Sequence, residues 1–366
     1  MHNNRLRSIA MPLAMAAVLV SCGGGSAASG GGAISAPAPS PSPSPSPSPT
    51  PTPTPSQSLL TQADARIGAC VNMANHLEAN PTEGDWGRAI TDTDFADIAA
   101  VGFETIRLPV RWSNKASATP PYTIDAAWMQ RVEDVVGQAR AAGLRVILND
   151  HHYDAIFENP DAEKERFAAI WKQVAERFQG ADDMVWFELL NEPHNQIDDA
   201  NLLSILEPAL AEVRATNPTR PVVVGGQNYS GINSLATLPL PNDPYLIATF
   251  HFYDPFPFTH QGAPWVTPVR PTGVTYGSAA DQQELEGAVQ KARDFMTSTG
   301  IPVFMGEYGA YDPIPMDQRE SYYRAVSTAF RGADVDGCIW GYTNSFAFRD
   351  QNTGVWHQNL LDAIGL

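Results

Sequence analysis

The chain has 366 residues, and its 40 acidic and 23 basic side chains give a formal net charge of −17. Such a surface repels polyanions, which argues against nucleic acid as a partner. Hydrophobic residues make up 43% of the chain, enough for a substantial core and too many for a disordered protein.

The first 22 residues have the pattern of an export signal. Arg5 and Arg7 precede the apolar run Ile9–Val20, which is too short to span a bilayer as a mature helix. The run ends in Leu19-Val20-Ser21-Cys22, which resembles a bacterial lipobox with cleavage before Cys22 and a diacylglycerol on its sulfur. We therefore expect a lipoprotein signal peptide over 1–21 and an exported protein held at the cell envelope, at the outer membrane or cell surface, through Cys22 alone. The alternative is an ordinary signal peptide and a secreted protein.

Residues 22–58 have the composition of a linker. Gly23–Gly32 is rich in Gly, Ser and Ala, which predicts flexibility, and Pro37–Pro55 alternates Pro with Ala, Ser or Thr. Alternating prolines favour a semi-rigid polyproline spacer with nothing to pack against. We therefore expect the folded domain to occupy residues 59–366.

Within 59–366, short apolar runs alternate with amphipathic stretches. Strands are expected at Ile67–Met73, Thr105–Pro109, Arg145–Leu148, Met184–Leu190, Pro221–Gly225, Leu246–His251, Pro302–Gly306 and Gly337–Gly341. Helices are expected at Thr91–Ala100, Asp125–Ala142, Glu163–Phe178, Asn201–Thr216, Gln282–Thr299 and Gln318–Phe330. This α/β pattern over about 300 residues predicts a single (β/α)8 TIM barrel, with a doubly wound sheet as the alternative.

Cysteine is sparse after Cys22. Only Cys70 and Cys338 remain, and both lie in apolar, strand-like runs. This favours buried free thiols, with a disulfide bridge in an oxidising compartment as the alternative.

The run Met184–Leu190 predicts a strand buried on both faces, and it stops at Asn191-Glu192-Pro193. Because proline keeps the preceding residue out of the helical region, we expect Glu192 in extended geometry at the C-terminal end of the strand. Apolar walls there would raise its pKa and make it a candidate proton donor.

Polar and aromatic residues follow the ends of the predicted strands. In chain order they are Asn72 and Asn75, Arg107, His151 and His152, Asn191 and Glu192, Gln227 and Asn228, His251 and Tyr253, Glu307 and Tyr308, and Trp340. In a barrel the C-terminal face of the strands carries the site. Glu192 and Glu307 follow strands four and seven, which lie across the barrel mouth. A separation of ~5–5.5 Å between two such carboxyls would suit retaining glycoside cleavage.

The motifs at these positions resemble those of the family 5 glycoside hydrolases over about residues 67–361. They are Ile106-Arg107-Leu108-Pro109, Leu148-Asn149-Asp150-His151-His152, Asn191-Glu192-Pro193, His251-Phe252-Tyr253, Gly306-Glu307-Tyr308-Gly309 and Ile339-Trp340. Asn72–Asn75, Glu78 and Gly84–Gly87 resemble the first-strand region of the family's β-1,4-glucanases. The family usually has glycine at positions 70 and 74, which leaves the subfamily in doubt.

The resemblance implies a retaining, endo-acting hydrolase of cellulose-type β-1,4-glucan, working as a monomer without cofactor by double displacement. Glu192 would be the acid/base and Glu307 the nucleophile. Asn191 would bond the sugar 2-hydroxyl, Tyr253 would orient Glu307, and Trp340 would stack under the sugar. Arg107, His151 and His251 would complete the polar shell.

Three alternatives stay open for the function. A β-mannanase or a mixed-linkage or xyloglucan hydrolase would use the same residues with other loops. A non-catalytic carbohydrate-binding surface protein and a metal-dependent hydrolase are different classes. We expect no metal, because adjacent His151 and His152 on a strand end would point to opposite sides.

Several side chains also have a structural interpretation. Glu188 is expected to pair with Arg107 inside the barrel, and His194 to face solvent. Trp128 and Trp171 fall on predicted helices and are expected in the core, whereas four tryptophans near strand ends are candidate sugar platforms: Trp86, Trp112, Trp265 and Trp356. The irregular stretches Tyr229–Pro244 and Asp254–Ser278 are expected to wall an open groove.

Overall fold

The computed structural model describes residues 59–366. The predicted signal peptide (1–21) and the whole of the predicted linker (22–58), Cys22 included, lie outside the described residues. Within the described part of the chain, no helix has the length and hydropathy needed to cross a membrane.

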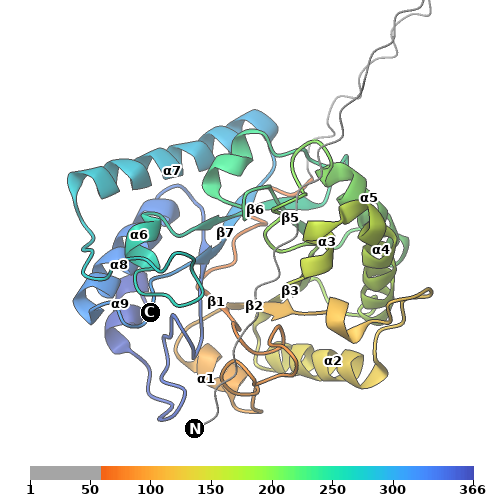
Figure 1. The fold of residues 1–366 in the computed structure, drawn as a ribbon, viewed down its shortest axis with the longest axis horizontal. Helices are drawn as coiled ribbons and strands as arrows, with labels where there is room; N and C mark the ends of the chain where they lie inside the picture. Colours follow the sequence, from red (N-terminus) through yellow and green to blue (C-terminus); the bar gives the residue numbers. More distant parts are fainter. Residues whose placement is uncertain (1–58) are drawn as a thin grey trace, which may run out of the picture. The chain divides into compact units, whose positions relative to one another are not determined.

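Eight parallel strands close into a barrel in chain order, and β8 pairs with β1. The strands are β1 Cys70–Asn72, β2 Thr105–Val110, β3 Arg145–Asp150, β4 Val185–Glu188, β5 Val222–Gly225, β6 Leu246–Phe252, β7 Val303–Tyr308 and β8 Gly337–Ile339. Figure 1 shows the strands as an inner ring with the helices around it. The predicted (β/α)8 barrel is confirmed, and the doubly wound alternative is excluded.

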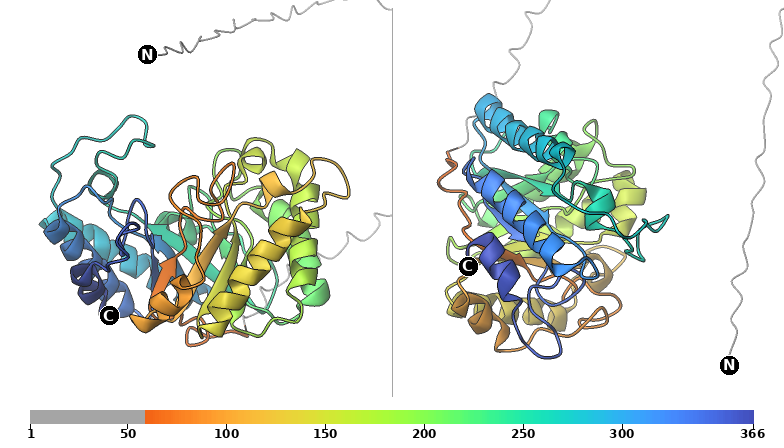
Figure 2. Two further views of the ribbon diagram at one scale, coloured as in Figure 1. Left: turned by 90° about the horizontal axis from the view of Figure 1, so that it is seen from below. Right: turned by 90° about the vertical axis from the view of Figure 1, so that its left-hand side faces the viewer.

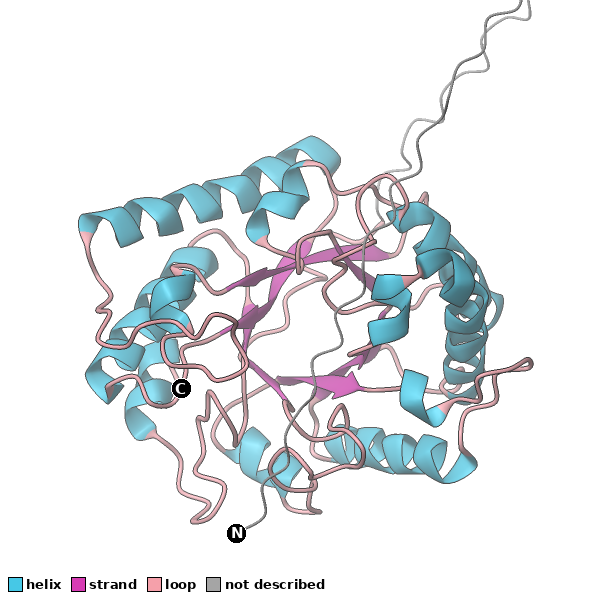
Figure 3. Ribbon diagram, in the orientation of Figure 1, coloured by secondary structure: helices cyan, strands magenta, loops and turns pink. Residues whose placement is uncertain are grey.

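The helices form the outer layer, as Figure 3 shows. They are α1 Asp94–Ala100, α2 Ala126–Ala141, α3 Asp154–Glu158, α4 Pro160–Arg177, α5 Leu202–Thr216, α6 Phe256–Thr259, α7 Ala279–Thr299, α8 Met316–Arg331 and α9 Gln358–Ile364. Two 3-10 segments, η1 Ser113–Lys115 and η2 Ile232–Ala236, lie in loops. The six predicted helices are present, whereas the short α3, α6 and α9 were not predicted.

The barrel interior is built in layers by the two-residue period of the strands. An apolar layer separate from the main core contains Ala65, Ile67, Cys70, Ile147, Trp186, Val223, Ile247, Phe304 and Cys338. Two residues further along their strands, Asn72, Asn149 and Glu188 form a buried polar layer. Since strand residues two apart share a face, the polar layer lies next to the apolar layer, on the side of the C-terminal strand ends.

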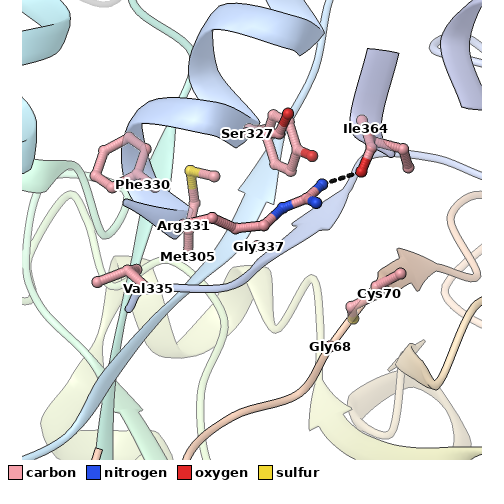
Figure 4. Close-up of a pocket in the computed structure, with 11 residues that line it drawn as sticks. Gly68, Cys70, Met305, Ser327, Phe330, Arg331, Val335, Gly337 and Ile364 are labelled. Carbon is pink, nitrogen blue, oxygen red and sulfur yellow. Dashed lines mark hydrogen bonds between the residues drawn. The ribbon is translucent and has the colours of Figure 1, made fainter. Parts of the chain in front are cut away.

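Cys70 and Cys338 form a disulfide within the apolar layer, so the expectation of free thiols was wrong. The reason is barrel closure: β1 pairs with β8 in a register that sets Cys70 opposite Cys338, with a Cα–Cα distance of 4.3 Å. A hollow of about 10 Å³ beside Cys70, shown in Figure 4, is lined by α8 and by Ile364 of α9. It has room for about one water molecule and no ligand.

Residues 59–68 cross the opposite end of the barrel. Leu59 N donates to Pro244 O at 2.8 Å, and the Gln62 amide exchanges hydrogen bonds with both backbone groups of Val303. The Asp336 carboxylate accepts from Ile67 N at 2.9 Å. All these partners lie at the N-terminal ends of strands, so this segment closes the end away from the polar layer.

Candidate active site

A hollow of about 520 Å³ opens at the C-terminal end of the barrel. It is lined by Asn75, Trp86, His151, His152, Glu192, Tyr253, His260, Trp265, Glu307, Trp340, Asn344, Ser345 and Phe346. The lining combines two carboxylates, amides and imidazoles with aromatic rings. Polar groups set among exposed aromatic faces suit a carbohydrate, which offers hydroxyls at its edges and C–H groups on its faces.

Glu307 reaches this hollow because β7 carries a bulge. Strand alternation would turn Glu307 to the helix side together with Val303 and Met305, which lie in the outer core. The pairing with β6 instead runs from Phe250 opposite Met305 to His251 opposite Glu307, and so leaves Gly306 as an extra residue. A bulge of this kind re-aims the next side chain, so Glu307 points into the mouth.

Gly306 is required at the bulge by the space around it. A Cβ there would lie 2.6 Å from Thr249 Oγ1 and 3.0 Å from His251 Nε2. Beyond the bulge, Tyr308 turns back to the outer core, where its ring lies 5.7 Å from that of Tyr323. Tyr308 is therefore not part of the site.

Glu192 has a left-handed backbone with a φ of 48°. The extended geometry predicted from Pro193 is wrong, because β4 ends at Glu188 and tertiary contacts set the conformation of the turn. The Glu192 carboxylate meets His251 Nδ1 at 2.7 Å, and its carbonyl meets His194 Nδ1 at 2.5 Å. A non-glycine residue held this way costs about 1–3 kcal/mol, so these contacts must hold it in place.

The two glutamates face each other across the mouth. One carboxylate oxygen of each lies, with a ring nitrogen of His251, in a group whose atoms are all within 4.8 Å of one another. The Glu192 side chain is 25% exposed, and that of Glu307 is 5% exposed. Glu192 therefore stands at the rim and Glu307 deeper in the hollow.

Arg107 connects the polar layer to Glu307. Its guanidinium pairs with Glu188 through two hydrogen bonds of 2.6 Å and with Glu307 at 2.7 Å. The expected Arg107–Glu188 pair is thus present, with Asn149 Nδ2 donating to Glu188 at 2.8 Å. The same guanidinium donates to Asn191 Oδ1 at 2.6 Å. Because this bond uses the oxygen of the Asn191 amide, its N–H groups point away from Arg107.

Tyr253 and Asn72 complete this network. The Tyr253 hydroxyl donates to the second Glu307 oxygen at 2.9 Å. Asn72 accepts from Arg107 at 2.9 Å and donates to Gly306 O at 3.0 Å, which ties the bulge to the arginine. Glu307 is therefore fixed through both of its oxygens.

The neighbours give the two carboxyls different proton affinities. Burial raises the pKa of Glu192 to about 7, although the positive charge of Arg107 opposes it. The pKa of Glu307 is also raised, chiefly by burial, and the contacts with His251, Arg107 and the Tyr253 hydroxyl oppose that rise. Burial lowers the pKa of His251 to about 4, so its ring is neutral at pH 7. Glu192 is thus suited to carry a proton, and Glu307 to carry a negative charge.

Glu192, His251 and Glu307 are also the group among residues 59–366 whose donor atoms could hold a cation. Arg107, however, lies 2.7 Å from Glu307 and already supplies a positive charge there. A divalent ion would be repelled at that distance, so the residues fit a carboxylate pair better than a metal centre.

His151 and His152 both line the hollow, so the prediction of opposite sides was wrong. His152 has a left-handed φ of 55°, which ends the strand alternation. The two rings meet edge to face with centroids 4.5 Å apart. His151 stacks parallel to Trp340 at 5.6 Å, so these two rings form one wall.

Two of the four predicted sugar platforms line the hollow. Trp86 is 36% and Trp265 51% exposed. Trp112 is fully buried with its Nε1 bonded to Asn149 O, and Trp356 packs on Phe103 and Tyr342. Both predictions failed because alternation gives no direction for a side chain beyond the strand end. Trp128 and Trp171 lie in the core as expected.

The two irregular stretches contribute unequally. His260 and Trp265 of Asp254–Ser278 line the hollow, and Figure 2 shows the teal loop after β6 projecting from the domain. No residue of Tyr229–Pro244 belongs to the lining, although Tyr229 stacks on His194. His194 is half-buried between aromatic rings, which corrects the solvent-facing expectation.

Other side chains at this end have different positions. Gln227 bonds Asp199 at 2.6 Å, and neither it nor Asn228 lines the hollow. Asn344, Ser345 and Phe346 do line it but were missed, because they follow β8 in a loop without periodicity. Their position just after Trp340 was the available signal.

Comparison with known proteins gives a consistent result. The family model described as cellulase (glycosyl hydrolase family 5) matches residues 68–345. Endoglucanase H of Acetivibrio thermocellus is 34% identical over 305 residues, which cover 82% of this chain and 33% of that protein, so the chain spans about a third of that relative's length.

Two solved structures are similar over most of the chain. A hyperthermophilic endo-β-1,4-glucanase in complex with substrate gives a TM-score of 0.81 at 33% identity, covering 84% of this chain and all of the other. Thermotoga maritima Cel5A with mannotriose gives 0.79 at 34% identity, covering 81% of this chain and 97% of that one.

Proposed function

This chain belongs to the cellulase family, glycosyl hydrolase family 5, and is a glycoside hydrolase; from that premise we propose that it is a retaining endo-β-1,4-glucanase. The observation that carries the proposal is the short distance between Glu192 and Glu307: one carboxylate oxygen of each lies within 4.8 Å of one of the other. Retaining enzymes need carboxyls ~5–5.5 Å apart, whereas inverting enzymes need ~6.5–9.5 Å to admit a water.

Glu307 is the nucleophile in this proposal. Its carboxylate attacks the anomeric carbon while Glu192 protonates the departing glycosidic oxygen, which gives a glycosyl-enzyme and a shortened chain. Water then attacks the same carbon and breaks its bond to Glu307, while the Glu192 carboxylate takes a proton from that water. The Arg107 and Tyr253 contacts to Glu307 support a charged nucleophile, and the raised pKa of Glu192 supports a proton donor.

The remaining predicted residues bind sugar. Asn191, fixed through Oδ1 by Arg107, presents its amide hydrogens to the 2-hydroxyl. Trp340, backed by His151, stacks under the sugar at the cleavage point. The exposed Trp86 and Trp265 extend the aromatic lining, which suits a polymer held across an open cleft and cut internally.

The substrate assignment rests on the named relatives, which are endoglucanases. A β-mannan is the second candidate, because the similar Thermotoga maritima Cel5A has been solved in complex with mannotriose as a substrate. Loss of viscosity against release of reducing ends, measured on carboxymethylcellulose and on mannan, separates the two substrates and tests internal cleavage.

We extend the proposal to the location of the enzyme. The lipobox-like Leu19–Cys22 after a short apolar run supports export and lipid anchoring at Cys22. The long Pro-rich stretch that follows is suited to hold a domain away from a membrane.

The mechanism is tested with Glu192→Gln and Glu307→Ala. Each should lower turnover of carboxymethylcellulose by several orders of magnitude while binding of cello-oligosaccharides is retained. Unchanged turnover in either variant would contradict the assigned roles, whereas binding without turnover in the wild type would favour a binding protein. Treatment with a chelator should leave the rate unchanged, and loss with rescue by a divalent ion would favour the metal-dependent class.

A further inference from the structure

The backbone of Glu192 is held by the second residue after it. His194 Nδ1 lies 2.5 Å from Glu192 O, across Pro193. A carbonyl oxygen only accepts, so Nδ1 carries the hydrogen of this bond. The bond holds the peptide that follows Glu192, whose own φ is the left-handed 48°.

The His194 ring is itself clamped on both faces. Phe157 of α3 lies at a centroid distance of 4.0 Å, and Tyr229 stacks on the other face at 4.4 Å with an interplanar angle of 15°. Phe157 is buried, whereas Tyr229 is 54% exposed. Contact with both neighbours restricts the movement of the ring.

Tyr229 belongs to an unusual turn. Asn228, Tyr229 and Ser230 are three consecutive non-glycine residues with φ of 54°, 60° and 52°. Left-handed residues normally occur singly, so the surrounding contacts must hold this run. A Cβ on Gly225 would lie 2.4 Å from Ser230 Oγ, so a side chain there would have to displace this hydroxyl.

The same turn holds both partners of the Glu192–His251 pair. Tyr229 N donates to Pro193 O at 3.1 Å, beside Glu192. Ser230 O accepts from His251 N at 2.8 Å. The strained turn and His194 therefore set the backbone positions from which Glu192 and His251 meet at 2.7 Å.

We propose that His194 is a positioning residue for the proton donor, which aims the Glu192 carboxyl through its Nδ1–H bond to the Glu192 carbonyl. This inference rests on the proposed function. His194 does not contact reacting atoms; it acts in the first step, where the bond from carbon to the leaving oxygen breaks, the bond to Glu307 forms and the Glu192 proton passes to the leaving oxygen.

The test separates the donor from the ring. His194→Phe keeps a ring between Phe157 and Tyr229 but has no donor. His194→Asn places an amide N–H near the position of Nδ1 but loses the ring. Each is assayed for kcat/KM on two β-cellobiosides, one with a dinitrophenyl leaving group that departs without a proton and one with a phenyl leaving group that needs it.

His194→Phe should lower kcat/KM on the phenyl substrate roughly 10- to 100-fold, a part of the 10²–10⁴ that general acid catalysis supplies, and less than about threefold on the dinitrophenyl substrate. His194→Asn should retain most of the phenyl activity. An equal loss on both substrates, or a loss in His194→Asn as large as in His194→Phe, would overturn the proposal.

Glu192→Gln is the reference for the proposed function. If it shows no dependence on the leaving group, the assignment of Glu192 itself fails. If it shows that dependence and His194→Phe does not, only the inference about His194 fails. If His194→Phe does not fold, Tyr229→Leu is used instead, because it removes the exposed ring that stacks on His194. This variant should also lose more activity on the phenyl substrate than on the dinitrophenyl substrate. An equal loss on the two substrates would overturn the proposal.

Discussion

Glu192 and Glu307 are the same residue type in one hollow, and their neighbours make them chemically different. Glu307 lies deep, with Arg107 on one oxygen and Tyr253 on the other. Glu192 stands at the rim with the neutral His251 as its hydrogen-bond partner. The charge of Arg107 favours an ionised Glu307, while burial without a direct cation favours a protonated Glu192.

This difference predicts the pH dependence of the reaction. The acid/base must be protonated for the first step, and burial raises the pKa of Glu192 to about 7. We therefore expect kcat/KM to fall as the pH rises through about 7, and to fall again at low pH where Glu307 becomes protonated. Initial rates on phenyl β-cellobioside over a range of pH give both limbs.

Glu192→Gln, assayed on the dinitrophenyl substrate, is the control for that profile. It should show the acid limb alone, because the dinitrophenyl group leaves without a proton and Glu307 still titrates. A wild-type rate on phenyl β-cellobioside that stays constant well above pH 7 would show that Glu192 is not the titrating acid.

A second residue-scale prediction concerns Arg107. Arg107→Met should lower the free energy of unfolding by about 3–5 kcal/mol, since it leaves the buried Glu188 and Glu307 without their cation. Urea unfolding measures the change. The control is Lys164→Met at an exposed pair with Asp161, which should cost less than about 1 kcal/mol. A similar small loss in both variants would mean that Arg107 carries no special share of the stability.

At the scale of elements, the regular parts of the chain were predictable and the exceptions to regularity were not. Alternating apolar and amphipathic runs give the eight strands, and the two-residue period places Glu188 above Trp186 inside the barrel. The same period would turn Glu307 outward, and only the bulge at Gly306 brings it to the mouth. Glu307 was assigned to the mouth from its place at the end of a strand, and its role as nucleophile came from the family motif.

Residues with a left-handed backbone could not be predicted from the sequence either. Glu192 and His152 depart from the strand direction because contacts from distant segments hold them, and no local pattern encodes such contacts. The disulfide was missed for a related reason, since Cys70 and Cys338 become neighbours only when β8 closes on β1. The short α3, α6 and α9 have too few turns to show a period.

The seam between β1 and β8 gives an element-scale prediction. Every other pair of neighbouring strands is consecutive in the chain and connected by one loop-and-helix segment. By contrast, β1 and β8 are 268 residues apart at the cysteines, and the disulfide links them directly. The double variant Cys70→Ala/Cys338→Ala should lose roughly 2–5 kcal/mol of unfolding free energy. Thermal and urea unfolding with and without reductant test this.

Reductant in the unfolding medium distinguishes the bridge from the side chains. Reductant should lower the unfolding free energy of the wild type to near that of the double variant, and it should leave the value of the double variant unchanged. Equal stability of the wild type and the double variant under oxidising conditions would show that the bridge adds nothing to barrel closure.

At the scale of the whole molecule, the candidate active site and the first described residues, 59–68, lie at opposite ends of the barrel. Residues 59–68 cover the N-terminal strand ends through Leu59, Gln62 and Ile67, the last bonded to Asp336, while the hollow opens at the C-terminal ends. Catalysis on a soluble substrate should therefore not depend on residues 1–58.

Cys22→Ser tests this separation together with the proposed anchor. The serine variant cannot carry the thioether-linked lipid, so after expression in a bacterial host the enzyme should move from the membrane fraction to the soluble or secreted fraction. Its kcat and KM on a soluble cello-oligosaccharide should equal those of the wild type, because the lipid lies outside the catalytic domain.

Detergent-resistant retention of the variant would disprove anchoring through Cys22, and a wild type found only in the medium would favour the ordinary signal peptide. An altered kcat in the released variant would instead mean that the anchor region affects the barrel, against the opposite placement of the two ends.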